Sequence, residues 1–183
     1  MGNKTNPRLL RLNITDTWDC VWYAEGQYSE NVLQDFMIRN HLKTVFKRAG
    51  VSRIRIRRRI GRVMVEVFVG RSGFVFGRKG MDLAMVKEEV TSFLPKKTLL
   101  TLKVLDQQNP EANSRLIGEW IASQLERRIP FRRAMKMAIQ KAQKAGVEGI
   151  KVTCGGRLAG SEIARTESYL EGKVPLHTFR ADI

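Results

Sequence analysis

Valines and isoleucines interleave with arginines over residues 51–69, and this pattern constrains the fold more than any other part of the chain. Successive side chains of a β-strand point to opposite faces, so such a pattern predicts strands with one buried and one exposed face. Gly61 divides the segment and predicts a two-stranded hairpin. The apolar positions are Val51, Ile54, Ile56, Val63, Val65, Val67 and Val69. The hairpin should therefore carry a basic face or a basic turn.

A ten-residue stretch of this hairpin contains six arginines, at positions 53, 55, 57, 58, 59 and 62. Such density is typical of a solvated face, but like charges this close repel one another unless an anion neutralises them. Phosphate groups of RNA are the anion that we expect. The RNA-binding candidates on the first strand are Arg53, Arg55 and Arg57, although the strand register decides which of them point outward.

The composition also favours a polyanionic partner. Lysine and arginine total 33 against 18 aspartates and glutamates, which gives a formal net charge of +15. A hydrophobic content of 43% excludes a disordered basic tail, since such a chain can bury enough apolar surface to fold. Further RNA-binding candidates in the N-terminal segment are Lys4, Arg8 and Arg11.

Turn signals and periodicity predict an α+β chain in three parts: an extended arm over 1–28, a first domain over 29–106 and a second over 107–183. In the first domain we expect an amphipathic helix over 30–49, the hairpin, a glycine-rich turn, a helix over 81–94 and a strand over 98–104. The apolar residues of this amphipathic helix, which should face the core, are Val32, Leu33, Phe36, Met37, Leu42, Val45 and Phe46. In the second we expect helices over 111–128 and from Pro130 to Gly146, then strands over 150–154 and 174–179.

A short glycine-bounded basic loop, Gly77-Arg78-Lys79-Gly80, precedes the helix expected over 81–94. Glycines at both ends let a phosphate backbone approach closely, while Arg78 and Lys79 supply positive charge. The alternative is an ordinary glycine turn with two solvated basic residues. Because the loop follows a β-hairpin and stands between helical segments, as in KH domains that clamp nucleotides, we favour RNA binding.

The helix that begins near Pro130 has two sharply different faces. At about 100° per residue, its apolar face contains Phe131, Ala134, Met135, Ala138, Ile139, Ala142 and Ala145. Its opposite face contains Arg132, Arg133, Lys136, Gln140, Gln143 and Lys144. A solvated helix face usually mixes in glutamates that pair with lysine or arginine one turn away, and this one has none.

Catalytic, metal and cofactor sites are not predicted. His41 and His177 are the only histidines, and spacing connects neither to a nucleophile or to paired carboxylates, so we expect no enzyme and no small-molecule substrate. Cys20 and Cys154 belong to no metal-binding pattern and should be buried small groups. No segment has the length or apolar character of a membrane span or signal peptide, so we expect no membrane partner.

Five segments together resemble one protein family. They are Met1-Gly-Asn-Lys-Thr-Asn-Pro, Gly73-Phe-Val-Phe-Gly-Arg-Lys-Gly, Ser123-Gln-Leu-Glu-Arg-Arg-Ile-Pro-Phe-Arg-Arg-Ala-Met-Lys, Gly156-Arg-Leu-Ala-Gly-Ser-Glu-Ile-Ala-Arg-Thr-Glu and Val174-Pro-Leu-His-Thr-Phe-Arg-Ala-Asp-Ile. The chain is similar to the bacterial-type small-subunit ribosomal protein three, a KH-domain protein of the ribosomal head.

The resemblance implies an N-terminal type II KH domain and a smaller C-terminal α/β domain with two helices and a shortened sheet. It also implies binding to small-subunit ribosomal RNA and to neighbouring head proteins, on ribosomes of a bacterial cytoplasm or an organelle matrix. In that family, basic residues here matched by Arg132, Arg133 and Lys136 line the opening where messenger RNA enters and help to part its structure. Arg157 and Arg165 are the RNA-contact candidates of the fourth segment.

Two positions depart from the family pattern. Met137 stands where members often carry another basic residue, so the messenger site should be less charged. The chain stops at Ile183, where members usually continue through a further β segment, so the C-terminal sheet should be short. A bare strand edge invites pairing, and we therefore expect a neighbour, either RNA or polypeptide, to cover it.

Overall fold

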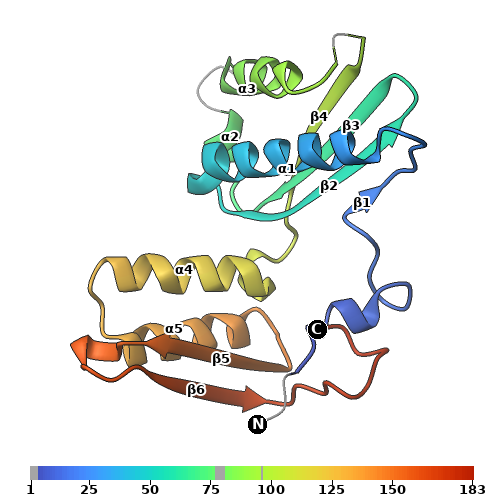
Figure 1. Ribbon diagram of the computed structural model, residues 1–183. Helices are drawn as coiled ribbons and strands as arrows, with labels where there is room; N and C mark the ends of the chain where they lie inside the picture. The colour runs from blue at the N-terminus through green and yellow to red at the C-terminus, as the bar shows by residue number, and fades with distance from the viewer. Residues whose placement is uncertain (1–3, 77–80, 96) are drawn as a thin grey trace. The chain divides into compact units, whose positions relative to one another are not determined.

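The computed structural model describes residues 4–76, 81–95 and 97–183 (Figure 1). It divides the chain into two compact units: Trp18–Gln108, and the residues up to Thr17 together with Asn109–Ile183. Both units combine helices with strands, which confirms the α+β class. The first 28 residues, which we expected to form one arm, are shared between the two units. The three-part division with its limits at residues 28 and 106 stays a prediction.

A four-stranded sheet in the order β1-β2-β3-β4 organises the unit Trp18–Gln108. Its strands are β1 (Cys20–Val21), β2 (Val51–Arg59), β3 (Arg62–Val69) and β4 (Leu99–Asp106). The predicted hairpin is confirmed, since β2 and β3 pair antiparallel and Arg59 stands opposite Arg62. Gly61 turns the chain with a φ of 69°, a left-handed conformation that glycine adopts without strain. The outer pairs, β1 with β2 and β3 with β4, are parallel.

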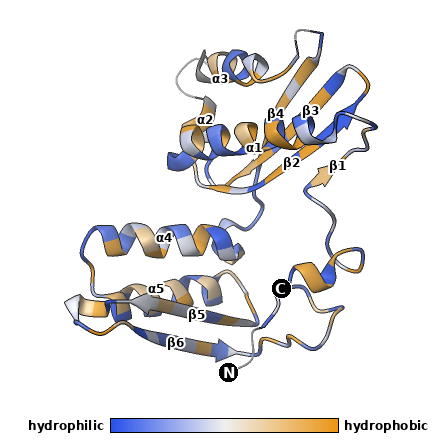
Figure 2. Cartoon of the chain, in the orientation of Figure 1, coloured by the Kyte–Doolittle hydropathy of each residue, from blue (hydrophilic) through white to orange (hydrophobic). Residues whose placement is uncertain are grey.

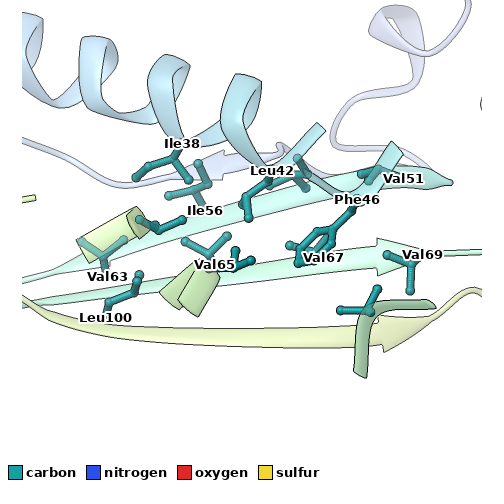
Figure 3. Packing of buried hydrophobic residues seen from close by; sticks show 14 of the residues in the cluster. Ile38, Leu42, Phe46, Val51, Ile56, Val63, Val65, Val67, Val69 and Leu100 are labelled. Atoms are coloured by element: carbon teal, nitrogen blue, oxygen red, sulfur yellow. The ribbon is translucent and has the colours of Figure 1, made fainter. Parts of the chain in front are cut away.

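Helices α1 (Tyr28–Val45), α2 (Gly73–Phe76) and α3 (Met81–Ser92) complete this unit. Along the chain, α1 is followed by the hairpin, α3 and β4 in the predicted order, and the segment expected as a glycine-rich turn contains the short helix α2. Helices α1 and α3 contribute apolar residues to one core with the alternate valines of β3. Figure 3 shows Ile38 and Leu42 of α1 against Val65 and Val67 of this strand. The core includes Ile38, Leu42, Phe46, Ile54, Ile56, Val63, Val65, Val67, Val69, Val86, Val90 and Leu100.

The prediction of which face of α1 is buried is largely wrong. Leu42 and Phe46 are buried as expected, but the other apolar residues assigned to the core are 40 to 63% exposed. The exposed residues are Val32, Leu33, Phe36, Met37 and Val45. The inner face of α1 instead contains Ile38 and the carboxylate of Asp35, which is buried because it binds Arg58 of β2. A pattern search that expects only apolar residues inside misses a face built around a buried ion pair.

The second unit contains two helices and a two-stranded sheet. Helix α4 (Ser114–Glu126) begins at Asn113, whose side chain accepts hydrogen bonds from the first-turn amides, and α5 (Phe131–Lys144) follows Pro130. Strands β5 (Gly149–Gly156) and β6 (Arg165–Gly172) pair antiparallel, so the sheet is short as expected. The core joins α4, α5 and the inner face of the strands through Ile121, Phe131, Met135, Ala138, Ile139, Val152 and Leu158.

The final strand lies at Arg165–Gly172 and not at 174–179, where we predicted it. Gly149 and Gly172 stand opposite each other at the end of this pair. A Cβ on either residue would overlap the facing backbone, at Lys173 or at Glu148 respectively. Glycines are therefore required where the strands approach most closely. After Gly172 the chain leaves the sheet and runs on in turns without pairing as a strand.

Candidate nucleic-acid interface

Helix α5 separates its apolar and basic residues as the sequence predicts. Its inner face is almost completely buried, from Phe131 at 7% exposed to Ala142 at 0%, with Ala145 partly buried at the helix end. Arg132, Arg133 and Lys136 are all exposed on the other side. A helix of 14 residues packed along its inner face is a rigid support, so the backbone positions of these three residues keep a fixed spacing.

The carboxylate that α5 itself lacks comes from β6. Glu167 accepts two hydrogen bonds from Arg132, from Nε at 3.2 Å and from Nη2 at 3.1 Å. The same carboxylate forms an ion pair with Arg165, whose Nε lies 3.2 Å from Glu167 Oε1. Arg132 and Arg165, which the sequence analysis treated as unrelated candidates, therefore belong to one cluster. Glu167 was missed because nothing predicted a strand over 165–172, where Arg165 and Glu167 share a face.

The pKa values within this cluster shift as an ion pair requires. The hydrogen bonds from Arg132 lower the pKa of the Glu167 carboxyl from its ordinary value, with smaller lowering by the charges of Arg132 and Arg165 and opposition from partial desolvation. The hydrogen bonds to Glu167 likewise raise the pKa of Arg132. Glu167 and Arg132 are therefore both charged at neutral pH. Together with the formal charge of the Arg165 guanidinium, the cluster carries one net positive charge.

The first turn of α5 gives a reason for Glu167 to lie there. The amides of a helix N-terminus carry partial positive charge, which disfavours nearby cations. This first turn contains Arg132 and Arg133, no acidic residue and no capping side chain. Glu167 supplies the compensating negative charge from β6, so two arginines are tolerated at the end of a helix that disfavours them.

The arginines of β2 are mostly engaged within their own unit. Arg53 pairs with Asp19, and Arg57 lies 3.8 Å from Glu66 while half of its side chain stays exposed. The guanidinium of Arg55 lies over the ring of Phe68 at 5.2 Å. Its buried Nε has no hydrogen-bond partner among the described residues. Strand register thus places Arg53, Arg55 and Arg57 on the sheet face away from the helices. Of these three arginines, only Arg57 is exposed.

Arg58, which was not a candidate, is the most constrained residue of the run. Its guanidinium makes five hydrogen bonds, to Asp35, Asn31 and Gln34, and lies over the ring of Trp22 at 5.9 Å. The side chains of Arg58 and Asp35 are 10% and 6% exposed. Beyond Arg58, Arg59 and Arg62 are exposed on either side of the hairpin turn, together with the apolar Ile60. Figure 2 shows hydrophilic residues where β2 ends and β3 begins.

The N-terminal candidates have three different environments. Lys4 is exposed, whereas Arg8 forms an ion pair with Asp16 at 2.5 Å. Arg11 is only 1% exposed. Its guanidinium donates to five backbone carbonyls, those of Pro7, Pro175, Leu176, Thr178 and Ala181. Arg11 thus ties the N-terminal segment to the C-terminal one, and we do not propose it as an RNA contact.

The remaining candidates lie in loops. The loop Gly77-Arg78-Lys79-Gly80 falls outside the described residues, between α2 and α3. Arg157 is exposed at the turn after β5, where its Nε donates to the carbonyl of Ser161 at 2.9 Å. Ala159 in this turn has a φ of 54°, which is uncommon for a residue with a side chain.

Across 4–76, 81–95 and 97–183, no group of three histidine, cysteine or acidic side chains is placed to hold a metal ion. His41 contacts Glu89 at 2.9 Å and packs its ring against Phe93. Cys20 is exposed, contrary to our expectation, and accepts a contact from Arg39, whereas Cys154 is half-buried and burial raises its pKa. No described helix has the length and apolar character that crossing a membrane requires.

The order α1-β2-β3-α2-α3-β4, with a parallel β3–β4 pair and a GxxG loop between two helices, defines a KH-type RNA-binding protein. Two family profiles match the chain: "KH domain" over residues 37–112 and "Ribosomal protein S3, C-terminal domain" over 121–183. Curated proteins named small ribosomal subunit protein uS3 align with all 183 residues.

These relatives include the protein of Desulforapulum autotrophicum, 45% identical with 84% of its length covered, and that of Ehrlichia ruminantium, 46% identical with 86% covered. The protein of Gluconacetobacter diazotrophicus is 47% identical, with 80% of its length covered. The chain therefore belongs to the uS3 family of small ribosomal subunit proteins, which are structural and not enzymatic.

Proposed function

We propose that this chain is a structural constituent of the small-subunit head, where it binds small-subunit ribosomal RNA and lines the opening through which messenger RNA enters. Arg132, Arg133 and Lys136 bind the messenger backbone there and help to part its structure. The observation that carries the proposal is the exposed basic face of α5, whose opposite side is fixed in the core of its unit. Membership of the uS3 family supports the ribosomal setting.

Cations on a rigid helix suit a messenger that moves past them. Contacts to phosphate carry no sequence information, so every codon can pass through the same site. Arg132 and Lys136 are four residues apart, slightly more than one helical turn or ~6 Å along the axis. Cations at this spacing hold a single strand by its backbone, which stabilises it against pairing again with its complement.

A double substitution tests the messenger role. Arg132→Ala with Lys136→Ala should lower translation through stable messenger hairpins, while assembly of the subunit stays nearly intact because neither side chain contributes to the core. Lys151→Ala with Lys173→Ala is a matched control, since it removes two exposed positive charges from the same unit. An equal loss on unstructured messages, or the same loss in the control, would contradict the proposal.

The contacts with ribosomal RNA form a second part of the proposal. We place them at the loop Gly77-Arg78-Lys79-Gly80 and at exposed or partly buried cations outside α5. Those cations are Lys4, Arg8, Arg53, Arg55, Arg57, Arg157 and Arg165. Replacing Arg78 and Lys79 by aspartates should weaken RNA association and reduce its dependence on salt, because fewer counterions are released on binding. Unchanged affinity and salt slope would remove the loop from the interface.

Sedimentation distinguishes a ribosomal constituent from a free KH-type regulator. The native chain should migrate with small subunits and should reach neighbouring head proteins by short-range cross-linking. A chain found only outside the subunits would mean that the family fold here serves a different task.

A further inference from the structure

One cluster joins two elements that the proposed function treats separately. Glu167 Oε1 contacts both Nη2 of Arg132 on α5 and Nε of Arg165 on β6, at 3.1 and 3.2 Å. The two guanidinium groups therefore converge on a single oxygen atom. Glu167 is the least exposed member, with 22% of its side chain accessible against 61% and 50% for the arginines. The carboxylate lies beneath, and the cations lie above it in solvent.

We propose that Glu167 is a positioning residue that holds Arg132 and Arg165 side by side as one binding site for a backbone phosphate of single-stranded RNA. The inference rests on the proposed function of Arg132 and adds Arg165 and Glu167 to it. The ligand chemistry is a phosphodiester, from either the messenger or ribosomal RNA.

Donor geometry favours a phosphate ligand over a purely structural ion pair. A guanidinium has five N–H donors, and Glu167 occupies only part of each set. Nη1 of Arg132 and both Nη atoms of Arg165 have no hydrogen-bond partner within 4–76, 81–95 and 97–183. Guanidinium groups match the oxygens of a phosphate in pairs of parallel hydrogen bonds. Two of them held in place also avoid part of the entropy loss that flexible side chains undergo on binding.

Charge alone would predict that Glu167 harms RNA binding. A carboxylate beside phosphate repels it, and exposed ion pairs contribute little to the stability of a fold. The strand offers a matched comparison, because Glu171 lies on the same strand, is exposed and forms no ion pair among the described residues. Glu167→Gln and Glu171→Gln each raise the net charge by one. The positioning role predicts opposite effects on RNA affinity for the two variants.

The test measures binding of a labelled oligouridylate to the full purified chain over a range of salt concentrations. Glu171→Gln should strengthen binding by about twofold or less, through charge alone. Glu167→Gln should weaken binding by about two- to fivefold despite the added positive charge, because the arginines lose their common support. A gain that equals that of Glu171→Gln, or no change, would overturn the inference.

Two further variants separate geometry from folding and from charge. Arg165→Lys keeps the charge but loses the planar fork, and it should weaken binding about as much as Glu167→Gln does. Hydrogen exchange of the β5 and β6 amides should stay unchanged in both variants. Arg165→Lys binding as tightly as the parent chain would also overturn the inference, since a point charge would then suffice.

Reconstituted small subunits identify the source of the phosphate. Weaker incorporation of Arg165→Ala in competition with the parent chain indicates ribosomal RNA, whereas a loss confined to hairpin-containing messages indicates the messenger. If neither change is observed, the proposed phosphate site is overturned in the assembled subunit. The messenger role fails separately, if Arg132→Ala with Lys136→Ala leaves hairpin translation unchanged, because the oligouridylate comparison does not depend on it.

Discussion

Strand β2 and helix α5 are both rich in positively charged residues, but they engage these residues differently. In β2, Arg58 is buried against Asp35, and Arg53 pairs with Asp19. In α5, Arg133 and Lys136 extend into solvent, and Arg132 stays largely exposed although it binds Glu167. Strand β2, which has the denser positive charge, is therefore the element whose arginines are neutralised more completely within their own unit. Positive charge in a sequence marks an RNA surface only after the partners of each residue are known.

Arg58→Ala should have the largest effect, because it leaves the carboxylate of Asp35 buried without its main partner. Breaking a buried ion pair costs about 3–5 kcal/mol of unfolding free energy. Urea unfolding of the full chain measures this loss. The exposed neighbour provides the control, since Arg59→Ala should change the unfolding free energy by less than about 0.5 kcal/mol. Equal effects at the two positions would mean that β2 is merely a solvated basic face.

Arg11→Ala should come next, because Arg11 is a third case in which a cation serves the fold. Its buried guanidinium joins Pro7 to carbonyls between Pro175 and Ala181. Hydrogen bonds to charged groups are worth roughly 1.5–3 kcal/mol each when deleted from a buried site, and carbonyls left exposed to water recover part of this. We expect a loss of about 2–3 kcal/mol, seen as faster hydrogen exchange over 175–181. Unchanged exchange there would show that the segment is held by other contacts.

The elements of the fold were predictable because their periodicity is local. The hairpin alternation and the two faces of α5 each depend on a few neighbouring residues, and both agree with the structure. The inner face of α1 was not predictable in this way, because Asp35 is buried only in the presence of Arg58, 23 residues away. Strand β6 was not predicted for a similar reason. On the face that contains Arg165 and Glu167, only Tyr169 packs against the core, so the strand has no apolar alternation.

The exposed basic face of α5 was predictable from spacing, but its contact with Glu167 was not. The spacing of Arg132, Arg133 and Lys136 alone predicts one exposed face. No local pattern shows that Glu167 lies against Arg132, because 35 residues separate them and the contact depends on how β6 packs beside α5. Arg11 shows the same limit in another way. The sequence suggested an exposed RNA-binding residue, but the C-terminal segment buries its side chain.

The exposed residues of α5 should contribute little to stability, which sharpens the contrast with β2. Arg133→Ala with Lys136→Ala removes no hydrogen bond or ion pair among the described residues, and both side chains are exposed. The unfolding free energy should change by no more than about 0.5 kcal/mol, while RNA affinity falls. Urea unfolding and oligouridylate binding on the same samples measure the two effects. A stability loss comparable to that of Arg58→Ala would remove the distinction between the two elements.

The smallest expected effect is the titration of Glu167, which tests whether α5 and β6 share charge as the geometry implies. Hydrogen bonds from Arg132 lower the pKa of this carboxyl below its ordinary value of 4.5. A carboxyl with a lowered pKa in the folded chain stabilises the fold above pH 4.5, and that contribution is lost as the pH falls through the lower, folded value. Carboxyl carbon shifts in NMR spectra report the titration directly. Arg132→Ala should return the pKa of Glu167 toward 4.5, and Arg165→Ala should do so less, because Arg165 contributes less to the lowering. If Glu167 of the parent chain titrates at or above pH 4.5, the cluster of Glu167, Arg132 and Arg165 does not persist in solution. The contrast between the paired arginines of β2 and the exposed cations of α5 would then depend on Arg133 and Lys136 alone.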